Sequence, residues 1–269
     1  MATFFGEVLS VYSRAVEEDE EDDMTRENEE DEQIRREIEE KRQVDVHWLL
    51  QPDSGSLSCS DLVIAAGPNA TGFVSAYVLS SGGWRPVARV SLWNERSRTD
   101  GEPSCVLYQQ KQVLICQCSC YVAEDQLFQW TEKVFGCVQA RGLSVTVLSD
   151  CSVAEYKTSD YLSGSSTPFL RCLKTSTHSS ATSAVACPLL EPPNISCGLA
   201  AAVLTHCELQ RIPAVLYQLY SDVPHADSLS MQAYREPVSA VLKLDHQSPG
   251  AEVLQKITGV CAVQSNLYT

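Results

Sequence analysis

Apolar residues recur along most of the chain in two alternating patterns, which predict strands and helices in turn. Short apolar runs or a period of two indicate strands, whereas apolar residues three or four positions apart indicate helices. Strands are predicted at VDVHWLL (44–50), DLVIAAG (61–67), VARVSLW (87–93), CVLYQQ (105–110), QVLICQCSCYV (112–122), LSVTVLSD (143–150) and IPAVLYQLY (212–220). Helices are predicted at TGFVSAYVLSSG (71–82), AEDQLFQWTEKVFGCVQ (123–139), CGLAAAVLTHCELQ (197–210), SLSMQAYREPVSAVLKL (228–244, interrupted at Pro237) and AEVLQKITG (251–259).

This alternation predicts an α/β fold. Parallel strands need long crossover connections, and helices in those connections cover the faces of the sheet. We therefore expect a largely parallel sheet flanked by helices on both faces, in three layers, with one hairpin within 105–122. Residues 152–187 are rich in Ser and Thr and are interpreted as a long, mobile insertion of unassigned role.

The first 43 residues differ from the rest in charge. Residues 17–40 hold 15 acidic side chains and 3 arginines, so they carry −12 of the net charge of −15. So dense a run of like charges predicts disorder, although a short helix at about 30–42 is expected from i,i+4 charge pairs such as Glu32 and Arg36. The predicted organisation is a disordered acidic tail at 1–43 with an apolar head, an α/β domain at 44–262, and a flexible docking tail at 263–269.

Composition narrows the possible partners and compartments. A net charge of −15 disfavours nucleic acid and anionic membranes, so proteins are the expected partners. The chain begins without a secretory pattern, and no run reaches the roughly 18 apolar residues of a membrane span. We expect a cytoplasmic protein whose 12 cysteines are mostly reduced and buried in the core.

One turn resembles a phosphate-binding loop. GPNATG (67–72) follows a predicted strand and has the outer spacing of a P-loop, but Phe73 stands where the loop requires lysine. Nucleotide binding is therefore the minor interpretation. A turn from strand to helix needs small residues in any case.

The cysteines and histidines predict neither a metal site nor a catalytic one. The alternate cysteines of CQCSC (116–120) fall on one strand face, which favours core packing over metal binding. The histidines form no zinc motif, and neighbours such as His206 and Cys207 point apart on a helix. We expect no enzyme activity, no cofactor and no metal.

The chain ends in a compact apolar group. Leu267 offers an apolar side chain, Tyr268 adds a ring with a polar tip, and Thr269 carries the terminal carboxylate. Together these groups suit insertion into a pocket that holds an ammonium group. By composition alone such an ending should occur in roughly one chain per hundred, so it needs support from elsewhere in the chain.

That support comes from a resemblance. The ending resembles the hydrophobic-tyrosine-any motif with which proteasome activators dock between α subunits of the 20S particle. Together with ATFFGEV, the acidic run, LICQCSCYVAEDQLFQWTEKVFG, CPLLEPPNI, GLAAAVLTHCELQRIPAVLY and QSNLYT, the whole chain resembles the proteasome assembly chaperone family. The Ser-rich insertion and residues 222–250 do not contribute to the resemblance.

The resemblance implies a non-catalytic chaperone for 20S proteasome assembly. Such a chaperone forms a heterodimer with proteasome assembly chaperone 2, promotes and caps the heptameric α ring, and prevents off-pathway ring dimers. By analogy, Leu267, Tyr268 and Thr269 enter a pocket of an α subunit. The resemblance also implies a cytoplasmic protein with some association with the endoplasmic reticulum. It assigns neither the heterodimer interface nor the α pockets that are used.

The apolar head suggests a second anchor. Phe4, Phe5 and Val8 are unusually apolar for a solvated end, and they precede about 30 charged or polar residues with a reach of roughly 30 Å. They would bind a distant site on the assembling particle, or else fold back on their own domain.

Two other functions stay open. The first is an enzyme of nucleoside-phosphorylase-like architecture that uses the GPNATG turn. The second is an activator of mature proteasomes that shares only the ending.

Overall fold

The computed structural model describes residues 29–52, 55–92, 105–158, 168–178, 187–242 and 251–262. Two units divide the chain, Met1–Gln43 and Val44–Thr269. The described part of the first unit is helix α2 (Glu29–Lys41), which confirms the short helix expected there. Arg36 and Glu32 form its predicted ion pair at 3.0 Å. The predicted tails at both ends lie largely outside the described residues, so the predicted domain limits stay predictions.

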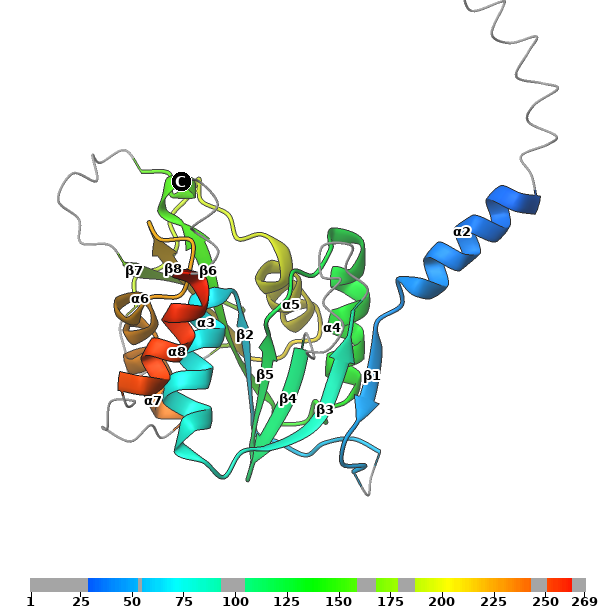
Figure 1. Cartoon of the computed structure of the whole chain (residues 1–269), viewed down its shortest axis with the longest axis horizontal. Helices are drawn as coiled ribbons and strands as arrows, with labels where there is room; N and C mark the ends of the chain where they lie inside the picture. The colour runs from blue at the N-terminus through cyan, green and yellow to red at the C-terminus, as the bar shows by residue number, and fades with distance from the viewer. Residues whose placement is uncertain are drawn as a thin grey trace, which may run out of the picture. The chain divides into compact units, whose positions relative to one another are not determined.

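The second unit is built on an eight-stranded sheet with the order β1-β3-β4-β5-β2-β6-β8-β7 (Figure 1). The strands are β1 (Asp45–Trp48), β2 (Asp61–Ala66), β3 (Arg85–Ser91), β4 (Cys105–Gln110), β5 (Val113–Cys118), β6 (Ser144–Ser152), β7 (Phe169–Lys174) and β8 (Ala214–Ser221). The helical segments are α3 (Pro68–Phe73), the π-helical turn η1 (Val74–Val78), the 3-10 turns η2 (Leu79–Ser81), η3 (Glu124–Gln126) and η4 (Val153–Glu155), α4 (Leu127–Gly136), α5 (Gly198–Leu209), α6 (Ser228–Ala233), α7 (Arg235–Leu242) and α8 (Ala251–Ala262).

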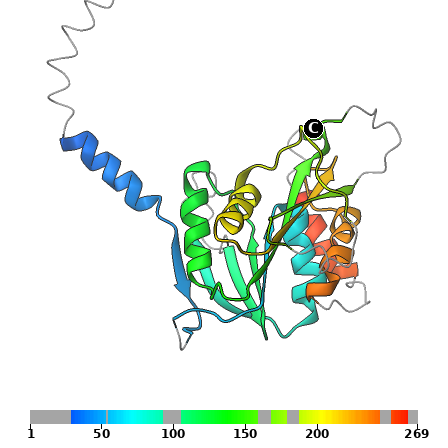
Figure 2. The same ribbon diagram turned by 180° about the vertical axis from the view of Figure 1, so that it is seen from behind.

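Helices cover both faces of the sheet, which confirms the predicted α/β class. Helices α4 and α5 lie on one face and α3, α6, α7 and α8 on the other, as the two opposite views show (Figures 1 and 2). Each face has its own apolar core, with Trp130 of α4 fully buried in one and Phe73 of α3 in the other. All eight residues of β8 are buried. The sheet is therefore the middle layer of three.

The sheet is mixed, with parallel pairing confined to its centre. Strands β5, β2, β6 and β8 are parallel neighbours, whereas β1, β3, β4 and β7 join by antiparallel pairs. The β4–β5 hairpin closes through two residues, of which Lys111 has a φ of 53°. So short a turn can join only antiparallel strands. The expectation of a largely parallel sheet therefore describes the centre but not the edges.

Two local predictions are wrong. Strand β7 lies inside the segment interpreted as a mobile insertion, because Phe169–Lys174 pairs along β8 and the Phe169 ring stacks on Tyr220 at 5.3 Å. The predicted break at Pro237 falls instead at Tyr234, between α6 and α7. Pro237 is the third residue of α7, where its missing N–H costs no helical hydrogen bond.

Candidate functional site

The GPNATG turn connects β2 to α3 at the carboxyl end of the parallel strands. Gly67 has a φ of 103°, which favours glycine, and a Cβ there would lie 2.8 Å from the Asp150 carboxylate. Asp150 comes from β6, the parallel neighbour of β2. The turn therefore needs glycine at position 67, because a carboxylate approaches its backbone closely there.

Asp150 takes the position that a phosphate would need. Its carboxylate accepts hydrogen bonds from the backbone N–H groups of Asn69 and Ala70, the second at 3.2 Å. These groups lie at the N-terminal end of α3, where backbone donors bind anions. A phosphate would have to displace a carboxylate supplied by the chain itself, which argues against the phosphorylase-like alternative.

Tyr234 completes this buried network from the opposite side. Its hydroxyl lies 2.6 Å from Asp150 Oδ1 and 2.8 Å from the Ser149 carbonyl oxygen, so the two acceptors share one proton. Asn69 Oδ1 accepts from the Asp227 N–H at 3.0 Å and so joins the turn to the start of α6. One set of polar groups thus holds β6, α3 and the α6–α7 region together.

Burial sets the protonation of this network. It raises the pKa of Asp150 to about 6, although hydrogen bonds from Tyr234 and from the α3 backbone oppose the rise. The pKa of Tyr234 is raised well above its ordinary value by burial and by the neighbouring Asp150. Tyr234 is therefore a hydrogen-bond donor at neutral pH, and no base in the network could readily remove its proton.

A cleft of about 390 Å³ lies beside the turn at the ends of β2, β5 and β6 and the start of α5. Ligands of α/β sheets commonly bind at this edge. None of the described residues that line this cleft is basic. Cys197 precedes α5 without a side-chain hydrogen bond that caps the helix. The described lining of the cleft thus offers no cationic side chain to an anionic substrate.

The cysteine-rich strand confirms core packing. Cys116 and Cys118 are buried in the same apolar core, and Cys116 Sγ lies 3.4 Å from Cys105 Sγ. Burial raises the pKa of Cys207 to about 12, so this thiol is protonated and structural, as expected. Within the part of the chain that the structure describes, no cluster of three or more His, Cys, Asp or Glu side chains could hold a metal ion.

The predicted docking residues are not among those described. Leu267, Tyr268 and Thr269 lie in 263–269, and the predicted anchor residues Phe4, Phe5 and Val8 lie in 1–28; both segments are outside the described ranges. Asp150 and Tyr234 were not among the residues predicted from the sequence. A carboxylate directly after the buried run of β6 was the available signal, whereas Tyr234 lies 84 residues away and gave none.

Comparison with known proteins identifies the family. A family model described as proteasome assembly chaperone 4 matches residues 1–269. A Danio rerio protein named proteasome assembly chaperone 1 is 67% identical, with 100% of both chains covered. The chain belongs to the proteasome assembly chaperone 1 family. Within this family, the Homo sapiens protein is 40% identical and the match covers 100% of this chain and 99% of that protein.

Solved structures share the fold of this proteasome assembly chaperone 1 family member. One is Pyrococcus furiosus PbaB, described as an archaeal proteasome activator, with a TM-score of 0.58 and 13% identity over 83% of this chain and 98% of that one. Another is P. furiosus PbaA, described as an archaeal homologue of proteasome-assembly chaperone, with a TM-score of 0.59 and 10% identity over 81% and 90%. At such identities the likeness concerns the fold alone. No helix among the described residues is long and apolar enough to cross a membrane.

Proposed function

We propose that this protein is a non-catalytic chaperone for assembly of the 20S proteasome. It acts as a heterodimer with proteasome assembly chaperone 2, caps the heptameric α ring and prevents off-pathway ring dimers. The observation that carries the proposal is the match to a protein named proteasome assembly chaperone 1, at 67% identity over the full length of both chains. We place this activity in the cytoplasm, with some of the protein at the endoplasmic reticulum.

In the proposed mechanism the C-terminal residues set the orientation of docking. Leu267 and Tyr268 enter a pocket of an α subunit, and the Thr269 carboxylate meets a lysine there. Burial of the two side chains contributes about 1.5 to 3 kcal/mol each. The charged contact adds about 1.5 to 3 kcal/mol. Ordering of the tail backbone costs about 1 to 2 kcal/mol per residue, so the tail alone binds weakly.

Most of the affinity must therefore come from the folded domain and its partner chaperone. Two linked contacts act at a high effective concentration, so weak sites combine into tight binding. In this division of roles the domain holds the ring, and the tail selects one register among the α subunits.

The tail is tested with Tyr268→Ala. Loss of the buried ring should weaken α-ring binding about tenfold or more, because burial of a large side chain is worth about 1.5 to 3 kcal/mol. Titration of the heterodimer against purified α subunits, followed by native mass spectrometry, measures the change. Deletion of Thr269 should have a similar effect.

The matched control is Gln264→Ala, which alters the same tail outside the docking group. This variant should bind the ring as the unaltered chain does, and all the variants should form the heterodimer. Unchanged ring affinity in Tyr268→Ala would contradict the docking mechanism. Loss of the heterodimer in Tyr268→Ala would show that the tail contributes to the contact between the two chaperones and would also contradict the mechanism.

An activator of mature proteasomes is the second candidate, because PbaB, which shares the fold, carries that description. The two functions differ in the particle that is bound. An assembly chaperone should co-purify with immature particles that lack β subunits, whereas an activator should co-purify with finished particles and increase peptide hydrolysis.

A further inference from the structure

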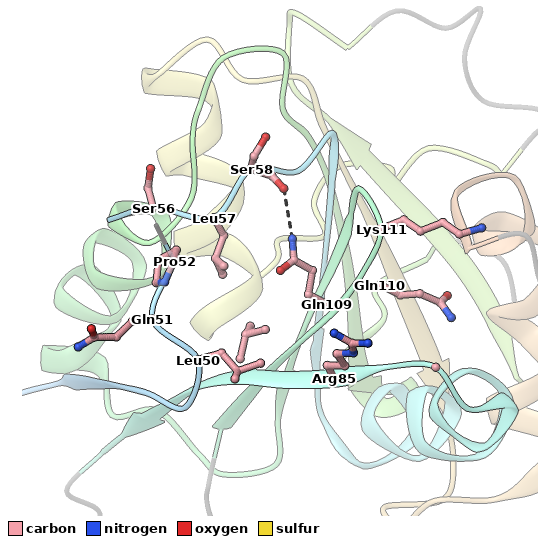
Figure 3. Close-up of a pocket in the computed structure, with 12 residues that line it drawn as sticks. Leu50, Gln51, Pro52, Ser56, Leu57, Ser58, Arg85, Gln109, Gln110 and Lys111 are labelled. Carbon is pink, nitrogen blue, oxygen red and sulfur yellow. Dashed lines mark hydrogen bonds between the residues drawn. The ribbon is translucent and has the colours of Figure 1, made fainter. Parts of the chain in front are cut away.

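A second pocket of about 660 Å³ lies at the end of the sheet opposite the GPNATG turn. The loop after β1, the start of β3 and the β4–β5 turn surround it (Figure 3). Leu57 and Val87 are buried at its base, and Leu50 is 52% exposed beside them. The pocket therefore combines an apolar floor with an open rim.

The rim is cationic. Arg85 and Lys111 line the pocket, and none of its described lining residues is acidic. Figure 3 shows Arg85 between Leu50 and Gln110, with Lys111 extending outward from the turn. Among the described residues, no ion pair of Arg85 or Lys111 is found.

The walls of the pocket are fixed by the backbone around it. Gln109 Nε2 donates to the Ser58 carbonyl oxygen at 3.3 Å, which joins β4 to the segment before β2. Gln110 Nε2 donates to the Gly82 carbonyl oxygen at 3.4 Å. Lys111 is held in the tight β4–β5 turn. Because the walls are already ordered, binding would cost little further ordering of this chain.

We propose that this pocket binds an acidic peptide segment of a partner protein, with carboxylates at the two cations and an apolar side chain on the floor. Charge complementarity selects this occupant. Residues outside 17–40 carry only −3 of the net charge, so the domain does not strongly repel an acidic chain. Arg pairs with carboxylate through two parallel hydrogen bonds, which suits a peptide carrying Asp or Glu.

The test uses the full chain and a dye-labelled peptide, Glu-Leu-Glu-Asp-Leu-Glu, followed by fluorescence anisotropy. Arg85→Glu/Lys111→Glu should weaken binding about tenfold or more, because two attractions become repulsions. The matched control, Arg89→Glu/Arg141→Glu, makes the same change at exposed positions outside the pocket and should bind as the unaltered chain does. Thermal unfolding of each variant verifies that it is folded.

Two further measurements separate the contributions of charge and floor. The amide peptide Gln-Leu-Gln-Asn-Leu-Gln should bind at least about tenfold more weakly, and added salt should weaken binding of the acidic peptide. Leu50→Ser, at the exposed leucine beside the apolar floor, should also weaken binding because apolar contact is lost, whereas Leu229→Ser, at an exposed leucine elsewhere, should not.

Several results would overturn the proposal. These are equal binding of the two peptides, equal loss in both double variants, or full competition by inorganic phosphate at matched ionic strength. Self-association that Arg85→Glu/Lys111→Glu abolishes would show a second copy as the occupant. Tyr268 is not among the described residues that line this pocket. Tyr268→Ala should therefore leave peptide binding unchanged, so failure here is distinguishable from failure of the tail mechanism.

Discussion

At the scale of single residues, Asp150 explains the GPNATG turn. A sequence that resembles a phosphate loop here binds a carboxylate of its own chain, which satisfies backbone donors at the start of α3. Phe73, where a phosphate loop has lysine, agrees with this interpretation, because no phosphate has to be neutralised. Small residues in a turn thus indicate that another group lies close to its backbone, but they do not identify that group as a phosphate or a carboxylate.

The raised pKa of Asp150 predicts a specific pH dependence. Its folded pKa is about 6 against an ordinary 3.8, so the folded state favours the protonated form. The stability from this group is fully present below pH 3.8 and is lost as pH rises through about 6. A pKa difference of about two corresponds to roughly 3 kcal/mol. Asp150→Asn should lack this fall.

Chemical denaturation between pH 3 and pH 7 measures this difference. The free energy of unfolding of the unaltered chain, relative to Asp150→Asn, should decrease as pH rises through about 6. Parallel curves for the two proteins would show that Asp150 does not titrate in this range.

Tyr234→Phe tests the other half of the network. The change removes the hydroxyl that donates to Asp150 and Ser149, so Asp150 Oδ1 keeps only the longer of its two described hydrogen bonds, from the Ala70 N–H. We expect a loss of about 1 to 3 kcal/mol in the free energy of unfolding. Tyr121→Phe, at a tyrosine that is 60% exposed, is the control and should cost much less. An equal cost in both would refute a special role for the network.

At the scale of elements, long periodic segments were predictable and partner-dependent ones were not. The pattern of α5 places Leu199, Val203 and Cys207 on one buried face, and its helix was predicted from that spacing. Strand β7 carries no such pattern, because its place in the sheet depends on β8, some 40 residues later. Tyr234 was not predicted for the same reason, because its partner Asp150 lies 84 residues away and leaves no sign in the residues around Tyr234.

Thr175→Val tests the hydrogen bonds that join the end of β7 to the start of β8. The Thr175 hydroxyl accepts from the Ala214 N–H at 2.8 Å and lies 3.2 Å from the Ile212 carbonyl oxygen. Valine has nearly the same shape but leaves the buried N–H without its acceptor, so a loss of about 1 to 3 kcal/mol in stability is expected. Hydrogen exchange of β7 and β8 should accelerate. Thr205→Val, at an exposed threonine of α5, is the control, because the Thr177 hydroxyl lies 3.3 Å from that of Thr175. Equal effects in the two variants would exclude this role.

At the scale of the whole molecule, the fold and the proposed docking segments are separate problems. The described helices and strands of the second unit form the folded domain. This domain carries the pocket lined by Arg85 and Lys111. The proposed docking residues, at 263–269 and in the first 28 residues, are not among those that the structure describes. Their role was inferred from residue chemistry and resemblance, since strand and helix periodicity carries no information about such ends.

The proposed anchor in the apolar N-terminal head can be tested in the assembling particle. If Phe4, Phe5 and Val8 anchor a distant site, a photocrosslinker at Phe5 should link to proteasome subunits in a chaperone-bound intermediate. Changing the three residues to Ser should reduce recovery of that intermediate, because their apolar contacts are lost. Crosslinks confined to the chaperone's own domain would reject the anchor.

The place of β2 in the sheet has a consequence during translation. This strand lies between β5 and β6, but its residues leave the ribosome before either partner has been made. The edge that pairs with β5 stays open until synthesis reaches Cys118, and the edge that pairs with β6 stays open until it reaches Ser149, roughly 80 residues after Ala66, or about 4 to 16 seconds at usual rates of elongation. During that interval the nascent chain presents an apolar strand to its surroundings, which makes early β2 the segment most in need of shielding from aggregation.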